Sequence, residues 1–183
     1  MLKILSNKKG FTLIELIVVF TVMAILATIG TVSLVSYSRT QTLNQATSDL
    51  VQTLNTAKSL SAVQVKTLNK NGKTLTQCQN QNLSGYGVTI SANVSSKQYS
   101  YSLYIACMNT SGILSKYTSI EMQTKLPGDV IIDPPTNMDV FFPVLSGGIT
   151  ATDGNSVVLK SVYSGISSKT IRFSQGYISV TSP

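Results

Sequence analysis

The sequence predicts an α+β fold, in which one long N-terminal helix packs on an antiparallel β-sheet. Two observations predict it. Near the N-terminus apolar residues form an unbroken run and then recur at helical spacing, whereas farther along the chain they alternate with polar residues. Spacing of three to four residues is typical of a helix with one buried face, and alternation is typical of a half-buried strand. We therefore expect a long helix followed by a β-rich domain at residues 67–183.

The first half of the predicted helix, residues 11–36, is long enough to cross a membrane. Residues 16–35 are 20 residues without a charge or a proline, and about 20 helical residues span the ~30 Å hydrocarbon core of a bilayer. A secretory signal peptide has a shorter apolar region, usually about 7–15 residues. Lys3, Lys8 and Lys9 precede the run. By the positive-inside rule they place the N-terminus in the cytoplasm and the rest of the chain outside.

The second half of the helix, residues 37–66, is expected to be an amphipathic continuation of the first. Its apolar residues recur at three- and four-residue steps, namely Leu43, Ala46, Leu50, Leu54 and Ala57. The first proline of the chain is Pro127, so no proline interrupts the pattern. The sequence therefore predicts one continuous helix from about residue 12 to residue 66.

Turn-forming residues at positions 69–73 end the helical pattern, and the period then changes to two. Alternation is clearest at residues 99–107, which predicts a half-buried strand. Gln175 and Gly176 separate the last two apolar segments and predict a tight hairpin. Strands are expected at 85–90, 99–107, 119–126, 140–144, 156–163, 169–174 and 177–181.

Glu15 stands out because it is the only charged residue between Lys9 and Arg39. A charged side chain costs about 2.5–3.5 kcal/mol at the centre of a membrane helix, and somewhat less near its end. Such a residue is expected to have a function and a partner. An ordinary single-pass anchor would explain the apolar run but not Glu15 or the Gly10-Phe11 junction before it.

The segment that begins at Lys8, KKGFTLIEL, resembles the cleavage and methylation motif of type IV prepilins and pseudopilins. The resemblance covers about residues 8–35. It implies that a prepilin peptidase cuts after Gly10, removes residues 1–10 as a leader and methylates the new N-terminal Phe11. It also implies that Glu15 acts in filament assembly, and that the fold is the pilin lollipop of a long helix on a β domain.

The resemblance has a physical rationale. Cleavage would expose a cationic amine on Phe11 at the edge of lipid, where an isolated amine and an isolated carboxylate are each costly. In low dielectric the two attract strongly, so Glu15 of an incoming subunit would pair with the amine of its neighbour. The alternative is that Glu15 only reaches the membrane surface or is neutralised by a proton.

The resemblance also implies partners and a location. The partners are other pilin or pseudopilin subunits, the peptidase, an inner-membrane assembly platform, and membrane lipid before assembly. The chain is expected in the cytoplasmic (inner) membrane, and in a cell-surface or periplasmic filament after assembly.

Within the family, the layout resembles the minor pseudopilins of type II secretion (the pseudopilin H-like class) and the minor pilins of type IV pili. Three features carry this likeness: the Gly85-Tyr86-Gly87 strand, the loop at Pro127, and the closing hairpin at Gly176. Each is a turn or strand feature that also recurs in other β domains. A major pilin therefore stays open as an alternative, as does a competence pilus subunit that binds DNA.

The DNA-binding alternative rests on three cations, Lys160, Lys169 and Arg172, which lie near aromatic residues in the sequence. Such a group would provide phosphate contacts, while Tyr163, Phe173 and Tyr177 would provide stacking surfaces. The alternative interpretation is that these cations are solvated side chains on strand edges, where they discourage unwanted strand pairing. The formal net charge of +7 includes three leader lysines, so the processed chain would carry 11 basic and 7 acidic side chains, or +4. That balance is modest for a nucleic-acid-binding protein.

The remaining chemistry points to a structural protein without a cofactor rather than an enzyme. Histidine is absent, so no Ser-His or Cys-His nucleophile can form. Cys78 and Cys107 lie on the exported side and predict a disulfide, the alternative being two buried free thiols. Two cysteines without histidine do not make a usual zinc site. The loop aspartates suit calcium but are better explained as turn formers; they are Asp129, Asp133, Asp139 and Asp153.

Overall fold

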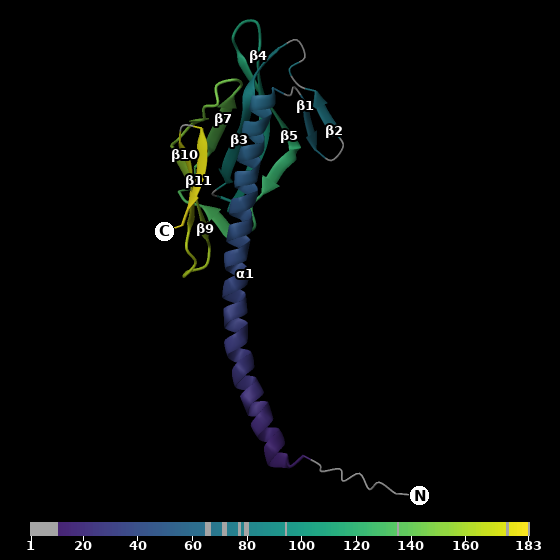
Figure 1. The fold of residues 1–183 in the computed structure, drawn as a ribbon, viewed down its shortest axis with the longest axis vertical. Coiled ribbons are helices and arrows are strands. Elements are labelled where there is room, and N and C mark those ends of the chain that lie inside the picture. Colours follow the sequence, from purple (N-terminus) through teal and green to yellow (C-terminus); the bar gives the residue numbers. More distant parts are fainter. Residues whose placement is uncertain are drawn as a thin grey trace, which may run out of the picture. The chain divides into compact units, whose positions relative to one another are not determined.

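The computed structural model describes residues 11–64, 67–70, 73–76, 78, 81–93, 95–134, 136–174 and 176–182. Among these residues, one long helix is followed by strands (Figure 1). The elements are α1 (Leu13–Val63), β1 (Thr67–Lys70), β2 (Lys73–Thr76), β3 (Asn82–Asn93), β4 (Gln98–Met108), β5 (Leu114–Lys125), β6 (Val130–Ile132), β7 (Met138–Pro143), β8 (Thr150–Ala151), β9 (Ser156–Ser161), β10 (Lys169–Ser174) and β11 (Tyr177–Thr181). The α+β class predicted from the sequence is confirmed.

Helix α1 is a single element of 51 residues. It ends at Val63, three residues before the predicted end, because Gln64 adopts a left-handed backbone conformation with φ of 57°. The Gln64 amide still donates a 3.0 Å hydrogen bond to the Leu60 carbonyl, which satisfies one acceptor of the last turn. Residues 65 and 66, where the sequence predicted the end, lie outside the described residues.

The chain divides into two compact units, and the boundary lies inside α1 between Ser38 and Arg39. The described part of the first unit, residues 11–38, is the apolar half of the helix, and each of its described side chains is exposed. The second unit begins at Arg39 and contains the remaining half of α1 together with all described strands.

The strands of the second unit form two main sheets and a separate hairpin, all with antiparallel pairing. The order is β5-β4-β3-β7-β8 in one sheet and β11-β10-β9-β6 in the other, while β1 pairs only with β2. The sequence predicted one sheet. The strands divide because Pro127 and Pro134 flank the short strand β6, and proline interrupts ladder pairing. Strand β6 therefore leaves β5 and pairs with β9.

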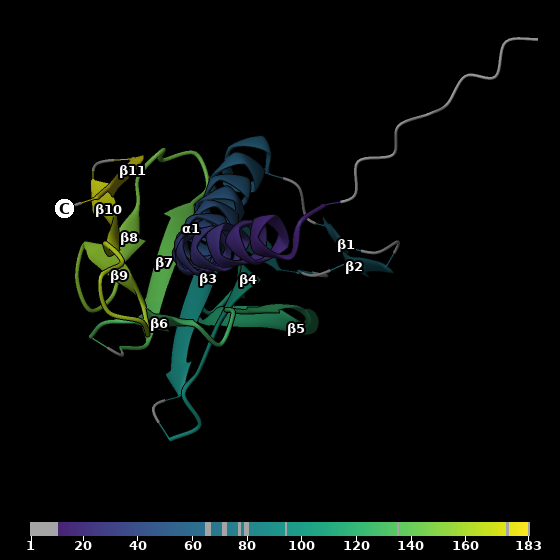
Figure 2. The same cartoon turned by 90° about the horizontal axis from the view of Figure 1, so that it is seen from below.

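The core lies between the C-terminal half of α1 and the two sheets. Leu43, Leu50 and Leu54 are fully buried, as the amphipathic pattern predicted. They pack in one apolar cluster with side chains of β3, β4 and β7 and with others of β9 and β10. Figure 2 shows this half of the helix lying across β3, β4 and β7, with β9, β10 and β11 to one side. Burial of this face holds a helix segment whose Ser and Thr content gives it only fair helix propensity.

Two glycines of β3 make room for aromatic rings on the sheet face that points away from α1. A Cβ atom on Gly87 would lie 2.3 Å from Cζ of Tyr104, and one on Gly85 would lie 2.7 Å from Cζ of Phe141. The two rings are parallel within 5°, with their centroids 6.5 Å apart. The Gly-Tyr-Gly sequence therefore has a packing role, because the two rings occupy the space that a side chain at position 85 or 87 would need.

Candidate functional site

The N-terminal end of α1 carries the residues that the sequence singled out. Thr12 precedes the first helical residue, and its hydroxyl oxygen accepts a 3.3 Å hydrogen bond from the Glu15 amide. Its carbonyl accepts a 3.2 Å bond from the Leu16 amide. Thr12 is therefore the N-cap, and Glu15 occupies the third helical position, the spacing of a capping box. A carboxylate in the first turn also interacts favourably with the helix dipole.

This capping role of Thr12 was missed from the sequence, although the Thr-x-x-Glu spacing before an apolar run is its recognised signal. It gives Glu15 a local structural role in addition to any role between subunits. Gly10, the predicted cleavage position, lies outside the described residues. Processing at Gly10 and Phe11 and the assembly role of Glu15 therefore stay predictions.

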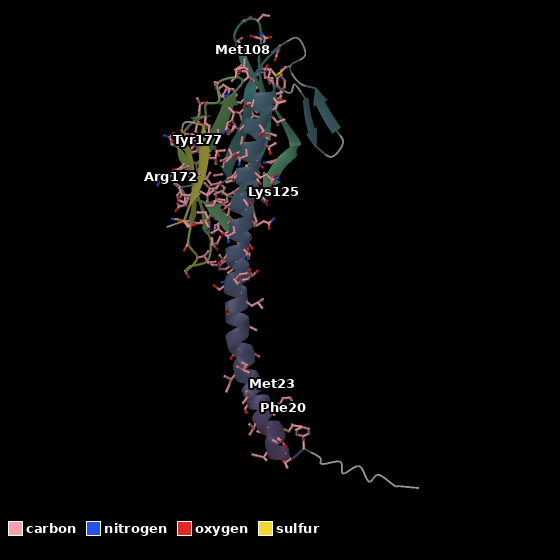
Figure 3. All side chains as sticks on the ribbon, in the orientation of Figure 1. Phe20, Met23, Met108, Lys125, Arg172 and Tyr177 are labelled. Atoms are coloured by element: carbon pink, nitrogen blue, oxygen red, sulfur yellow. A yellow bond between two sulfur atoms is a disulfide. The ribbon has the colours of Figure 1, made fainter. Side chains whose placement is uncertain are left out.

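An apolar surface follows Glu15 along the first unit. Its side chains project outward, as Phe20 and Met23 do in Figure 3. These two side chains are 62 % and 61 % exposed. The hydroxyls of Thr21 and Thr28 donate to the carbonyls of Val18 and Ile25, at 2.8 and 2.7 Å. These polar groups are satisfied within the helix, which suits an environment without water. By length and composition α1 can cross a membrane.

The two cysteines are joined. Cys78 and Cys107 form a disulfide with their Cα atoms 5.4 Å apart, which confirms the predicted pairing. Cys107 lies in β4 and is fully buried, and Cys78 is also buried. Cys78 has a left-handed φ of 63°. The bond thus ties the segment before β3 to the second strand of the large sheet.

The three cations of the DNA-binding alternative do not converge on one face of the four-stranded sheet. Lys160 forms an ion pair with Asp133. Lys169 has the same strand parity as the buried Ile171, lines a groove beside α1 and donates a 2.7 Å hydrogen bond to Ser182. Arg172 alternates to the opposite face and points outward (Figure 3).

The aromatic residues of that alternative are also engaged elsewhere. Phe173 is buried in the core and offers no stacking surface. The Tyr163 ring lies under the Arg39 guanidinium, with Cζ 3.6 Å from the ring centroid. The Tyr177 ring lies 5.8 Å from the Lys58 ammonium. No joint basic and aromatic patch results from these six residues.

The four aspartates that the sequence placed in loops do not form a cluster, and Asp139 lies in strand β7 rather than in a loop. Asp139 accepts hydrogen bonds from Thr89 and Lys116, and Asp133 is paired with Lys160. Within the part of the chain that the structure describes, no group of three or more His, Cys, Asp or Glu side chains is placed to hold a metal ion.

Comparison with known proteins gives one finding. A family model described as the prokaryotic N-terminal methylation motif matches residues 5–31. Neither the comparison with curated proteins nor the comparison with solved structures gave a match. The match includes Gly10, Phe11 and Glu15, so it rests on the segment that the sequence analysis singled out.

Together, the motif and the architecture define a class of protein. The motif supports the type IV prepilin and pseudopilin family and indicates a pilin-like or pseudopilin-like subunit. One long helix followed by antiparallel sheets is a pilin-like α+β fold. Members of the prepilin-motif family are structural subunits rather than enzymes. The apolar helix behind the motif suggests membrane anchoring, and the motif suggests interaction with other subunits and with prepilin peptidase.

Proposed function

We propose that the chain is a minor subunit of a type IV pilus or of a type II secretion pseudopilus. The observation that carries the proposal is one carboxylate, Glu15, inside a methylation motif and at the head of the first-unit part of α1, whose described side chains are exposed and otherwise uncharged. The subunit would wait in the inner membrane, N-terminus in the cytoplasm, and then enter the filament through this helix. The assembly platform would supply the machinery.

The proposed mechanism begins with cleavage after Gly10, which exposes a cationic amine on Phe11; the peptidase then methylates this amine. Phe11 precedes the helix, and its side chain is 79 % exposed. Glu15 of an incoming subunit pairs with that amine in a low-dielectric environment, where unpaired charges are costly. The apolar helices then pack side by side, so the ion pair fixes their register and the apolar contact supplies most of the attraction.

A sharp test separates the charge of Glu15 from its capping role. Glu15→Gln keeps the capping-box side chain, since Gln serves at that position as Glu does, but it removes the charge. Thr12→Ala is the matched control: it removes the cap, at a cost of about 1 kcal/mol, and keeps the charge. We expect both variants to be cleaved and to remain in the membrane, with only Glu15→Gln lost from sheared filaments.

The measurement is quantitative immunoblotting of the membrane and filament fractions from a strain that carries each variant. Wild-type levels of Glu15→Gln in filaments would refute the assembly role of the charge. Equal loss of both variants would assign Glu15 to helix capping alone.

The order of three features along the chain supports the assignment as a minor subunit. The Gly85 and Gly87 strand follows the helix, Pro127 and Gly128 precede β6, and Gly176 closes the final hairpin. This order resembles that of minor pseudopilins and minor pilins. Mass-spectrometric stoichiometry of purified filaments tests it: we expect this chain at a small fraction of another pilin, and finding it as the most abundant subunit would make it the major pilin.

A further inference from the structure

An aromatic–cation pair lies at the start of the second unit. The guanidinium of Arg39, on α1, stacks 3.6 Å above the ring centroid of Tyr163, which belongs to the loop after β9. The backbone amides of the first two residues of this loop both donate hydrogen bonds. The Val162 amide donates to the Asp129 carbonyl at 2.9 Å, and the Tyr163 amide donates to the Ser161 hydroxyl at 3.2 Å. The loop is therefore fixed against the helix and against the turn before β6.

The first two residues of this loop, Val162 and Tyr163, are accessible, and exposed Ser164, Gly165 and Ser167 follow them. Val162 is 57 % exposed and Tyr163 is 38 % exposed, although the Tyr163 ring is covered on one side by Arg39. An exposed valine is apolar, and a tyrosine ring has an apolar body and a polar hydroxyl. Such a pair suits the boundary between water and lipid better than bulk water. Tyrosine rings are enriched where a protein meets the headgroup layer of a bilayer.

Chain connectivity keeps this loop near the membrane. Arg39 is the first charged residue after Glu15 and follows Val35, the last residue of the apolar run, by four positions. Four residues reach at most about 14 Å even when fully extended. This limit holds for any orientation of the two units. The polar headgroup layer itself adds several ångströms beyond the hydrocarbon core on each side.

We propose that the loop containing Val162 and Tyr163, clamped by Arg39, docks the second unit on the phospholipid headgroup layer before the subunit enters a filament. The proposal rests on membrane anchoring by the apolar helix, which belongs to the proposed function. Val162 and the edge of the Tyr163 ring enter the interface. Stacking uses the face of the guanidinium, and its N–H edge is the part that binds phosphate oxygens.

The second unit provides a matched control in another aromatic–cation pair. Tyr177 is 76 % exposed and lies beside Lys58. Lys58 follows Arg39 by 19 residues, which corresponds to about 28 Å along a helix. Tyr177 projects from the edge strand β11 (Figure 3). It is the control because it is an exposed tyrosine beside a cation to which the docking proposal assigns no lipid contact.

The absence of tryptophan from the chain makes a direct measurement possible. Tyr163→Trp introduces a single indole, and tryptophan preserves stacking with a cation. The full-length variant is reconstituted into vesicles of phosphatidylethanolamine and phosphatidylglycerol that contain a nitroxide-headgroup lipid. Tyr177→Trp is measured in the same way. Phe20→Trp, in the exposed apolar helix, is measured with an acyl-chain nitroxide and reports whether the helix is inserted.

We expect Tyr163→Trp to lose most of its fluorescence to the headgroup nitroxide and Tyr177→Trp to keep nearly all of it. Adding Arg39→Gln to Tyr163→Trp should lower the quenching, because the ring at position 163 loses the guanidinium that holds it, while the backbone hydrogen bonds of residues 162 and 163 remain. Unquenched Tyr163→Trp together with quenched Phe20→Trp would overturn the docking proposal and leave membrane anchoring intact. Unquenched Phe20→Trp would refute anchoring and the docking proposal with it. Unchanged quenching after Arg39→Gln would overturn the role of Arg39 as the clamp.

Discussion

Gly87 illustrates how one missing side chain shapes the outer face of the large sheet. The Tyr104 ring lies where a Cβ atom of residue 87 would be, and Tyr104 is only 1 % exposed. Its ring also lies 5.1 Å from the ammonium of Lys116, which is paired with Asp139. A side chain at position 87 would therefore displace a ring that several neighbours hold in place.

We predict that Gly87→Ala lowers the free energy of unfolding by about 1–3 kcal/mol, because overpacking forces ring and backbone to shift. Gly128→Ala is the control, since a Cβ atom at Gly128 meets nothing within 4 Å; its effect should stay within about 0.5 kcal/mol. Urea unfolding of the full chain in detergent measures both. Equal stability of the two variants would contradict the close packing at Gly87.

Three buried tyrosines are expected to make the folded chain less stable at high pH. Burial raises the pKa of Tyr86 to about 12, and Tyr86 is fully buried. The pKa of Tyr101 is raised first by burial and then by the charge of Asp49, and the pKa of Tyr104 is raised by burial and by Asp139. In each case the folded state holds its proton more tightly than the unfolded state does. The unfolded chain therefore releases protons first as the pH rises, which favours unfolding.

We predict that the free energy of unfolding is insensitive to these groups below pH ~10 and falls between about pH 10 and 12. The rise in the pKa of Tyr86 from 10.0 to about 12 corresponds to a loss of the order of 2–3 kcal/mol. Tyr86→Phe should show a smaller fall over the same pH range, as measured by urea midpoints. An identical fall in the variant would show that surface groups, not Tyr86, set the alkaline limit.

At the scale of elements, the disulfide joins two parts of the chain that are distant in sequence. Cys78, which lies between β2 and β3, is bonded to Cys107 of β4 across a sequence separation of 29. Such a cross-link restricts the unfolded chain more than it changes the folded one. It also anchors the start of β3, the central strand of the large sheet, next to its partner β4.

We predict that the double variant Cys78→Ala/Cys107→Ala loses roughly 3.5 kcal/mol of unfolding free energy, the chain-entropy value for a loop of this length. The reduced wild-type chain should unfold at nearly the same denaturant concentration as the double variant. A double variant as stable as the oxidised wild type would contradict a stabilising role for the bond.

The sequence predicted the elements whose patterns are long and periodic. The helix, the strand at 99–107 and the closing hairpin were all found, because burial on one face imposes a period over many residues. Strand β5 begins at Leu114 rather than 119, and β9 ends at Ser161 rather than 163. The short strands β1, β2, β6 and β8 were missed, since two to four residues are too few to establish a period.

The candidate site was predictable to a similar degree. The methylation motif and Glu15 could be recognised from the sequence, because the motif consists of particular residue types at fixed spacing. Lys169 and Arg172 lie on opposite faces of β10, because they are an odd number of residues apart in a strand. The sequence analysis grouped them without using this alternation. The stacking of Arg39 on Tyr163 joins residues 124 positions apart and has no local signal.

At the scale of the whole molecule, each unit has its own role. The first unit exposes a membrane-length apolar helix, and the second unit buries its apolar residues in its own core. An exposed apolar surface of this length needs lipid or other helices around it. In the proposed function, lipid before assembly and neighbouring subunits afterwards would satisfy that need in turn.

The measurement that tests this proposal most directly is the intact mass and N-terminal sequence of the protein purified from its native envelope. We predict a chain that begins at N-methylated Phe11, with residues 1–10 removed and the Cys78–Cys107 bond intact. A chain that retains residues 1–10 would contradict prepilin processing. Glu15 would then lack its partner amine, and the protein would be a single-pass membrane protein with an exported β domain.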